Sequence, residues 1–139
     1  MNTTPGPKPN ELAPRPAALS SSVEVFWLDR PRILRRLRQT AIQLHRSHPE
    51  IERILLFGSL ARGDAVPGSD ADLLLQLAES DRPFLERSSL YRISDMGIGV
   101  DVVAYTRTEL KEMCAAGNLF VAQALREGVV LWDAEGEQV

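Results

Sequence analysis

The sequence predicts an α/β (α+β) fold in which a small mixed β-sheet carries helices mainly on one of its faces. Short apolar runs with strand character alternate along the chain with segments whose apolar residues recur at helical spacing. Only three or four strand-like runs occur in 139 residues, of which 44% are hydrophobic, so the chain can bury one modest core. This arrangement leaves the other face of the sheet, or the ends of its strands, for a functional site.

The N-terminal segment differs in composition from the rest of the chain. Residues 1–25 hold five of the nine prolines, with Asn, Thr, Ser and Ala between them. Such a segment buries too little apolar surface to fold, and we expect a disordered arm. Residues 26–139 then form a single domain. Phe26 and Trp27 either pack onto the first helix or form an interface, and the sequence leaves both interpretations open.

A first helix is predicted from the cap residue Asp29, through Pro31 in its first turn, to about Ser47. Its apolar residues recur at helical spacing and are Ile33, Leu34, Leu37, Ala41 and Leu44. Arginines occupy the other faces of this helix. Most basic helix faces are simply solvated, although one of this kind also suits contact with a partner protein.

Strands and helices alternate in the rest of the chain. We expect strands over residues 51–57, 71–77 and 99–105, a short helix from Ser59, and a longer helix from Pro83 to Met96. Thr106 caps the following helix, and Gly117 with Asn118 separates that helix from the last one.

The composition of the chain limits the cellular compartment in which we expect it. No apolar run approaches the roughly 20 residues of a membrane span, and the N-terminus lacks the apolar segment of a signal peptide, so we expect a cytoplasmic protein. Cys114 is the only cysteine, and we expect a buried thiol within a helix.

Charge is distributed unevenly along the chain. Residues 1–48 hold eight basic and three acidic residues, a net charge of +5, whereas residues 49–139 hold eight basic and sixteen acidic residues, a net charge of −8. Because the second part is acidic, direct binding of nucleic acid is not expected.

Three aspartates lie at or near predicted strands. Asp70 and Asp72 flank one residue, so their side chains leave the same face of an extended chain and can share metal ions about 3.5 to 4 Å apart. Asp101 lies in the apolar run of residues 99–103, where a charge is costly to bury unless a cation or a donor compensates it. Each aspartate also has a structural explanation when it is taken singly. Asp70 could be a turn or cap residue, and Asp101 could lie on the exposed face of an edge strand. Together they indicate a site for divalent metal ions.

Gly58 and Ser59 follow a predicted buried strand at the start of the short helix. Glycine permits close backbone approach, the serine hydroxyl can donate, and unpaired amides at a helix start favour phosphate. A plain turn is the common alternative for such a pair. Arg62, one turn later, either reaches a phosphate or lies exposed on the helix surface.

Three motifs resemble those of the minimal nucleotidyltransferase branch of the DNA polymerase beta superfamily. They are Gly58-Ser59-Leu60-Ala61-Arg62-Gly63, Ser69-Asp70-Ala71-Asp72-Leu73 and Val100-Asp101-Val102. The resemblance spans roughly residues 33–132 and includes a closing helix and strand over residues 120–132. It implies a polymerase-beta-like nucleotidyltransferase fold with all three carboxylates in place.

This resemblance also implies the chemistry of the site. The reaction would be transfer of AMP from ATP to a hydroxyl group, with Mg²⁺ as cofactor and pyrophosphate as leaving group. Asp70 and Asp72 would hold two Mg²⁺ ions, and Asp101 would complete the site of the ion that binds the acceptor hydroxyl. The Gly-Ser pair would bind the β and γ phosphates.

The acceptor is expected to come from a partner, because the chain leaves too few residues for the helical acceptor domain of other superfamily members. The resemblance implies a toxin–antitoxin pair in which this protein, the antitoxin, AMPylates a HEPN-type ribonuclease toxin. Two alternatives stay open at this point. One is an antitoxin that only binds its toxin, and the other is a dimeric antibiotic-type enzyme that modifies a small molecule. Homo-oligomers and hetero-oligomers both fit the sequence.

Overall fold

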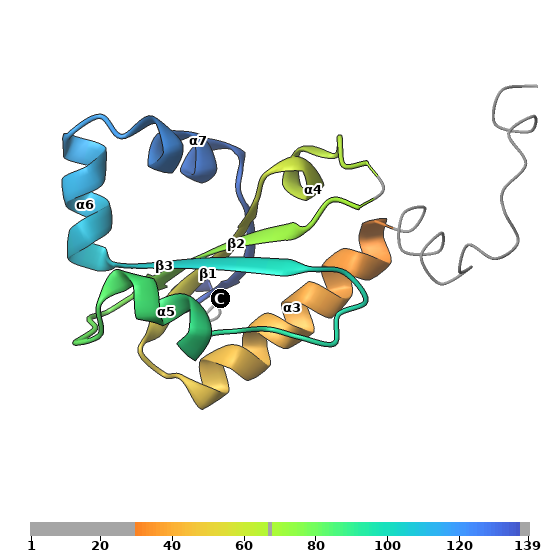
Figure 1. Cartoon of the computed structure of the whole chain (residues 1–139), viewed down its shortest axis with the longest axis horizontal. Helices are drawn as coiled ribbons and strands as arrows, with labels where there is room; N and C mark the ends of the chain where they lie inside the picture. Colours follow the sequence, from red (N-terminus) through yellow and green to blue (C-terminus); the bar gives the residue numbers. More distant parts are fainter. Residues whose placement is uncertain (1–29, 67, 137–139) are drawn as a thin grey trace, which may run out of the picture.

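Four strands form one mixed sheet in the order β3-β2-β1-β4, with helices packed against it (Figure 1). The computed structural model describes residues 30–66 and 68–136 of the chain. The elements, in chain order, are α3 (Arg30–Ser47), β1 (Ile51–Phe57), α4 (Ser59–Arg62), β2 (Ala71–Leu77), α5 (Phe84–Leu90), β3 (Val100–Thr106), α6 (Arg107–Ala115), α7 (Leu119–Glu127) and β4 (Val129–Asp133).

The sheet combines antiparallel and parallel pairing. β1 pairs antiparallel with β2 on one side and with β4 on the other, whereas β2 and β3 run parallel. Side chains of β1 are buried on both faces of the sheet, as shown by the consecutive buried residues Ile54, Leu55 and Leu56. A continuous apolar run, rather than strict alternation, is the pattern expected of such a central strand.

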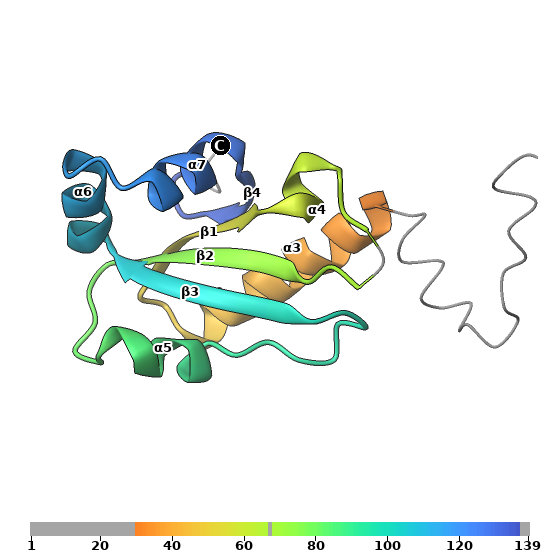
Figure 2. The same ribbon diagram turned by 45° about the horizontal axis from the view of Figure 1, so that its top comes forward.

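Each face of the sheet has its own core (Figure 2). The larger core lies under α3 and α5 and includes Ile33 and Leu37 of α3 together with Leu73 of β2. The smaller core lies under α6 and α7 and joins Leu74 of β2 to Val121 of α7. The predicted mixed sheet with one principal helical face is confirmed, and α6 and α7 cover part of the second face.

Most predicted elements agree with the structure. α3, β1, α4 and β2 have the expected residues, and β3 begins and ends one residue later than predicted. Thr106 caps α6 as expected, because its hydroxyl accepts the N–H of Glu109 while the Glu109 carboxylate accepts the N–H of Thr106. Asn118 caps α7 in a similar way.

The predicted helix from Pro83 to Met96 was wrong in its second half. α5 ends at Leu90, and residues 91–99 form an irregular connection to β3. Asp95 and Gly97 adopt positive φ angles of 63° and 82°, which a right-handed helix cannot contain. Tyr91 and Met96 are both buried in the larger core. In a helix these two side chains would point about 140° apart, so only a non-helical chain buries both.

Cys114 also differs from the prediction, because its side chain is exposed on α6, where only Leu110 is buried. The predicted arm of residues 1–25, and with it Phe26, Trp27 and Asp29, lies outside the described residues. Within residues 30–66 and 68–136, none of the helices combines the length and the apolar character that a membrane crossing requires.

Candidate functional site

One end of the sheet gathers the aspartates that the sequence singles out. β1 ends there, whereas the parallel strands β2 and β3 begin there (Figure 1). Phe57, the last residue of β1, pairs with Asp72, and Asp72 pairs in turn with Asp101. Asp70 lies two residues before Asp72. The strand register therefore places carboxylates from two neighbouring strands beside one another, on the face of the smaller core.

The carboxylates repel one another. Asp72 is half-buried, whereas Asp70 and Asp101 are exposed. Burial raises the pKa of the Asp72 carboxyl, and the charges of Asp101 and Asp70 raise it further. Arg62 is the cation that opposes this effect. Asp72 thus carries a charge that the surrounding carboxylates disfavour and that one arginine only partly compensates.

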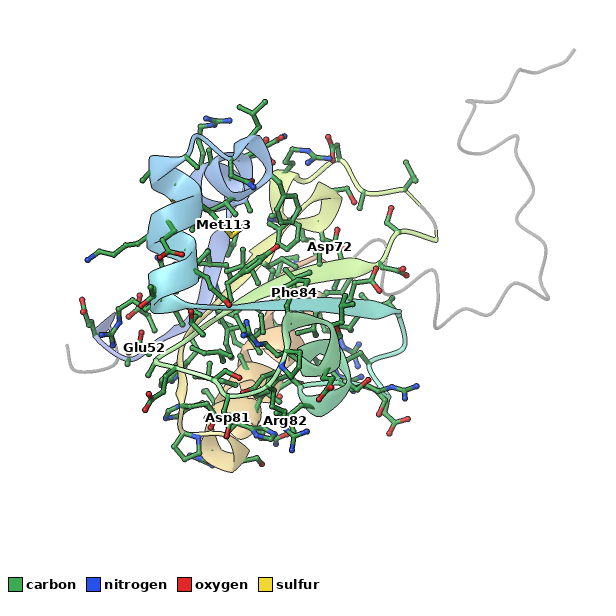
Figure 3. All side chains as sticks on the ribbon, turned by 60° about the vertical axis from the view of Figure 1, so that its left-hand side comes forward. Glu52, Asp72, Asp81, Arg82, Phe84 and Met113 are labelled. Atoms are coloured by element: carbon green, nitrogen blue, oxygen red, sulfur yellow. The ribbon has the colours of Figure 1, made fainter. Side chains whose placement is uncertain are left out.

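Gly58 connects β1 to α4 directly beneath Asp72. Its φ angle of 80° is one that other residues rarely adopt. A Cβ atom at position 58 would also lie closer than 3.0 Å to Oδ2 of Asp72. Two independent constraints therefore require glycine here, and they bring the backbone before Ser59 close to the carboxylate. Figure 3 shows Asp72 near the start of β2, beside α4.

Arg62 lies at the end of α4 and joins this site to α7. Its Nε donates to Oδ2 of Asp64 at 3.1 Å, and its Nη1 donates to Oε1 of Glu127 at 3.3 Å. Gln123 donates to the second oxygen of Glu127 at 3.2 Å. The sequence left Arg62 open between a phosphate contact and a free surface position. In the structure its side chain is 39% exposed but held by two carboxylates.

A small hollow of about 190 Å³ adjoins Gly58 and Arg62. Phe57 and Phe120 line it and meet edge to face, with ring centroids 5.5 Å apart. Local sequence patterns do not mark Phe120, Gln123 or Glu127 as residues of the site. These residues reach the site from α7, about 60 positions away in the chain, and no local pattern marks such a contact.

A second hollow of about 330 Å³ lies between the outer strand β3 and α5, the helix that covers the larger core. Asp101 lines it together with Ser88, Ser89 and Arg92, which belong to α5 and the residues that follow. No local pattern brings them together, because their proximity to Asp101 depends on the packing of α5 against β3.

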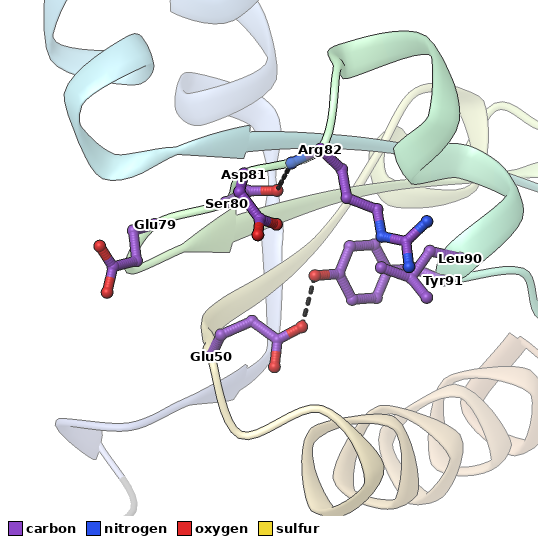
Figure 4. Close-up of a pocket in the computed structure, with 7 residues that line it drawn as sticks. All are labelled: Glu50, Glu79, Ser80, Asp81, Arg82, Leu90 and Tyr91. Atoms are coloured by element: carbon purple, nitrogen blue, oxygen red, sulfur yellow. Dashed lines mark hydrogen bonds between the residues drawn. The ribbon is translucent and has the colours of Figure 1, made fainter.

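A further hollow of about 540 Å³ lies at the opposite end of the sheet (Figure 4). There Tyr91 donates to Glu50 at 2.5 Å, and the Ser80 hydroxyl accepts the backbone N–H of Arg82. β1 extends over seven residues, or roughly 20 Å, between this hollow and Gly58. This polar hollow is therefore separate from the aspartates.

The aspartates suit a hard divalent cation by their donor chemistry. Carboxylate oxygens are the ligands that Mg²⁺ prefers, and a cation would relieve the repulsion that raises the pKa of Asp72. Among the described residues, no three His, Cys, Asp or Glu side chains converge on a common point as they lie. Asp70 and Asp101 are exposed, so their side chains can reorient toward an ion without disturbing the core.

Comparisons with known proteins agree with this geometry. The family model described as polymerase beta, nucleotidyltransferase, matches residues 39–137. A search of curated proteins finds no match to the chain.

Among solved structures, a candidate nucleotidyltransferase from Sulfolobus solfataricus is similar at 20% identity and a TM-score of 0.55, over 86% of this chain and 95% of the other. A toxin–antitoxin structure with AMP-PNP is similar at 24% identity and a TM-score of 0.50, over 72% and 76%. A mutant MntA–HepT toxin–antitoxin pair is 21% identical, with a TM-score of 0.49, over 72% and 75%. The first two likenesses show a shared fold.

Proposed function

Because the chain belongs to the polymerase beta nucleotidyltransferase family, we propose that it transfers AMP from ATP to a hydroxyl group of a partner protein. One observation carries this proposal above the others. Strand register places Asp72 between Asp101 on β3 and Phe57, next to Gly58, on β1. A nucleotide and an acceptor can therefore approach the same carboxylates from two sides.

The aspartates would hold two Mg²⁺ ions, Asp70 and Asp72 serving both and Asp101 serving the one on the acceptor side. Bound Mg²⁺ supplies charge stabilisation to a phosphoryl group under attack. Asp101 also accepts the proton of the acceptor hydroxyl, because it lies at the exposed edge of the sheet, where a proton can pass on to solvent.

Residues on the β1 side would bind the triphosphate. Gly58 brings the start of α4 up against the Asp72 carboxylate, and the Ser59 hydroxyl follows directly, so a phosphate bound there would lie beside the aspartates. Arg62 is fixed by Asp64 and Glu127, so part of its guanidinium is oriented before the nucleotide binds. Its charge lowers the pKa of the Asp72 carboxyl, which supports a role for Arg62 beside the reacting phosphate.

The partner proposed is a HEPN-type ribonuclease toxin, and this protein would be its antitoxin, acting in the cytoplasm as a hetero-oligomer. Two findings support this choice. A toxin–antitoxin structure shares the fold of this chain, and that structure was determined with AMP-PNP, an analogue of ATP. The basic residues of α3 also offer an exposed contact surface, which includes Arg35, Arg38 and Arg46.

The test is to incubate the protein with ATP, Mg²⁺ and the HEPN-type protein encoded beside it, and to weigh the products. Transfer should add about 329 Da per AMP to the partner, and ribonuclease activity should fall in parallel. Inhibition of the ribonuclease without a gain in mass would support an antitoxin that only binds. Modification of an aminoglycoside instead of the protein would support a small-molecule enzyme.

A further inference from the structure

The short helix α4, which begins at Ser59 beside the aspartates, has too few residues to stabilise itself. It spans four residues, and the last carbonyl groups of any helix lack partners within that helix. Here those carbonyls belong to Leu60 and Ala61, which are buried, with exposed fractions of 4% and 9%. Water is a poor partner for buried carbonyls, so they need donors from another part of the chain.

Arg30, the first residue of α3, supplies both donors. Its Nε donates to the carbonyl of Leu60 at 2.9 Å, and its Nη2 donates to the carbonyl of Ala61 at 3.0 Å. The start of α3 lies beside α4 in both views of the ribbon (Figures 1 and 2). One planar guanidinium thus binds two consecutive carbonyls, and the two bonds together restrict the orientation of α4.

Arg30 differs from the other arginines of α3. It is half-buried, whereas the remaining arginines of this helix are exposed. A positive charge at the start of a helix is disfavoured by the dipole of that helix, and no acidic residue in the first turn of α3 offsets it. The position of Arg30 is therefore explained by its contact with α4 and not by the stability of α3.

The other contacts of α4 restrict it less. Leu60 packs into the larger core, but apolar packing has no direction of its own. Arg62 pairs with Glu127 of α7, and the two side chains are 39% and 25% exposed. Ion pairs near the surface contribute little, because water and salt screen them. The two bonds from Arg30 are thus the main directional restraint at this end of α4.

The orientation of α4 determines where the backbone lies beside Asp72. The N–H of Arg62 donates to the carbonyl of Gly58 at 3.0 Å, so the two ends of α4 move together. Position 58 already lies so close to Oδ2 of Asp72 that a Cβ there would collide with it. A rotation of α4 would therefore change the geometry between the backbone and the carboxylate. In enzyme sites, a misplacement of about 1 Å can lower the rate by about a hundredfold.

We propose that Arg30 is a positioning residue for the nucleotide. By holding the carbonyl end of α4, it keeps Ser59 and the backbone at Gly58 where the β and γ phosphates bind. This inference rests on the proposed function and deepens it, since Arg30 acts through α4 and not by contact with the nucleotide. A different role, which the test must separate from this one, is attraction of the triphosphate by the charge of Arg30 alone.

Three variants of the full-length protein separate these roles. Arg30→Lys keeps the positive charge but offers one nitrogen in place of two, and Arg30→Ala removes both. Arg36→Ala is the control, because Arg36 lies on the same helix and also donates to a backbone carbonyl, that of Asp95 at 3.3 Å. Partner protein is left out of the assay, so contacts of α3 with a partner do not affect it.

Three measurements are made on each variant. Calorimetry with Mg²⁺ gives the affinity for ATP and for inorganic triphosphate, hydrogen exchange gives the protection of the amides of residues 62–64, and urea unfolding gives the stability. These amides report on α4, because they donate to the carbonyls of Gly58 and Ser59.

Both Arg30 variants should bind ATP and inorganic triphosphate about tenfold or more weakly than the wild type, and their amides 62–64 should exchange faster. Arg36→Ala should match the wild type in both. A merely structural role of Arg30 would lower stability in urea but leave the affinity of the folded protein for ATP unchanged. If Arg30→Ala does not fold, Arg30→Lys provides the same test.

Wild-type affinity for ATP in both Arg30 variants would overturn the inference, as would unchanged exchange of the amides 62–64. Wild-type affinity in Arg30→Lys alone would also overturn it, because charge without the second bond would then suffice. If the wild type binds ATP but transfers no AMP, the proposed reaction fails while the role of Arg30 in binding stands. If the wild type binds neither ATP nor inorganic triphosphate, the proposed function fails and this inference falls with it.

Discussion

Carboxylates at the two ends of the sheet differ in the groups that surround them. At the end distant from the candidate site, Glu109 accepts two hydrogen bonds from Arg87, at 2.7 and 3.1 Å, and Glu52 accepts from Gln76 and Arg107. Hydrogen bonds from these arginines lower the pKa of both glutamates. At the other end, burial and neighbouring carboxylates raise the pKa of Asp72.

This contrast separates carboxylates that stabilise the fold from carboxylates that do not. Removal of a paired glutamate, or of its arginine, leaves a polar group without its partner, and stability falls. Removal of Asp72 should relieve repulsion, so we expect the folded state to tolerate its loss. A half-buried charge that the folded protein leaves poorly compensated is a candidate for binding something else, and a cation is the simplest choice.

The largest effect is expected from Asp72→Ala. Loss of a metal ligand should lower transfer of AMP by about a thousandfold or more, because a bound ion stabilises the charge that develops on the phosphoryl group by several kcal/mol. The protein should stay folded, and its melting temperature without metal should equal or exceed that of the wild type. Mass spectrometry of the partner and thermal unfolding measure both effects. The control is Asp81→Ala, an exposed aspartate at the distant end, and full transfer by Asp72→Ala would refute the assignment.

Arg87→Ala should destabilise the protein by about 3 kcal/mol. Only 4% of Arg87 is exposed, and it donates to Glu109, to the carbonyl of Ala104 and to that of Arg82. Its loss leaves these acceptors unpaired, although Glu109 is partly solvated, which keeps the cost near the lower limit for such pairs. Urea unfolding measures the change. Arg38→Ala, at an exposed position of α3, should cost less than about 0.5 kcal/mol, and equal losses in both variants would contradict this account.

Gly58→Ala and Gly117→Ala form a matched pair. Both glycines have φ angles near 80°, namely 80° and 76°, so alanine should cost about 1 kcal/mol at either position. Only at position 58 would the new Cβ collide with Asp72, whereas nothing lies within 4 Å of it at position 117. Unfolding in urea should show roughly 1 kcal/mol of additional loss for Gly58→Ala, and calorimetry should show weaker binding of ATP. Equal behaviour of the two variants would mean that Asp72 does not constrain position 58.

Acid should remove the stabilisation that Glu109 gives to the distant end of the sheet, and it should also remove the repulsion that acts on Asp72. The lowered pKa of Glu109 means that its stabilisation is complete above the usual glutamate pKa of about 4.3 and is lost as the pH falls through the lowered value. The contribution of Asp72 to stability depends on pH in the opposite direction. Its raised pKa means that its charge is unfavourable in the folded protein at neutral pH, and protonation removes that cost. Unfolding between about pH 3 and pH 7 should therefore show a shallower acid loss of stability in Glu109→Gln and higher stability at neutral pH in Asp72→Asn. An unchanged slope in Glu109→Gln would contradict the first assignment.

The sequence predicted those parts of the molecule that local patterns determine. Asp70, Asp72 and Asp101 stand out because charge is rare beside buried strands, and Gly58 because it interrupts an apolar run. The helix predicted to reach Met96 ended at Leu90, since tertiary packing of Tyr91 and Met96 outweighed local helical preference. Glu127 could not be assigned in advance, because its contact with Arg62 exists only in the folded chain.

The pairing of Asp72 with Phe57 and Asp101 has a consequence for changes in chain length. Side chains alternate along β2, so a deletion of one residue within that strand would exchange Asp72 for Leu73 and turn an apolar side chain toward the candidate site. The same deletion would push a carboxylate into the larger core. Insertions and deletions inside β2 therefore damage reaction and folding together, whereas the irregular connection of residues 91–99 is where homologous chains can vary in length.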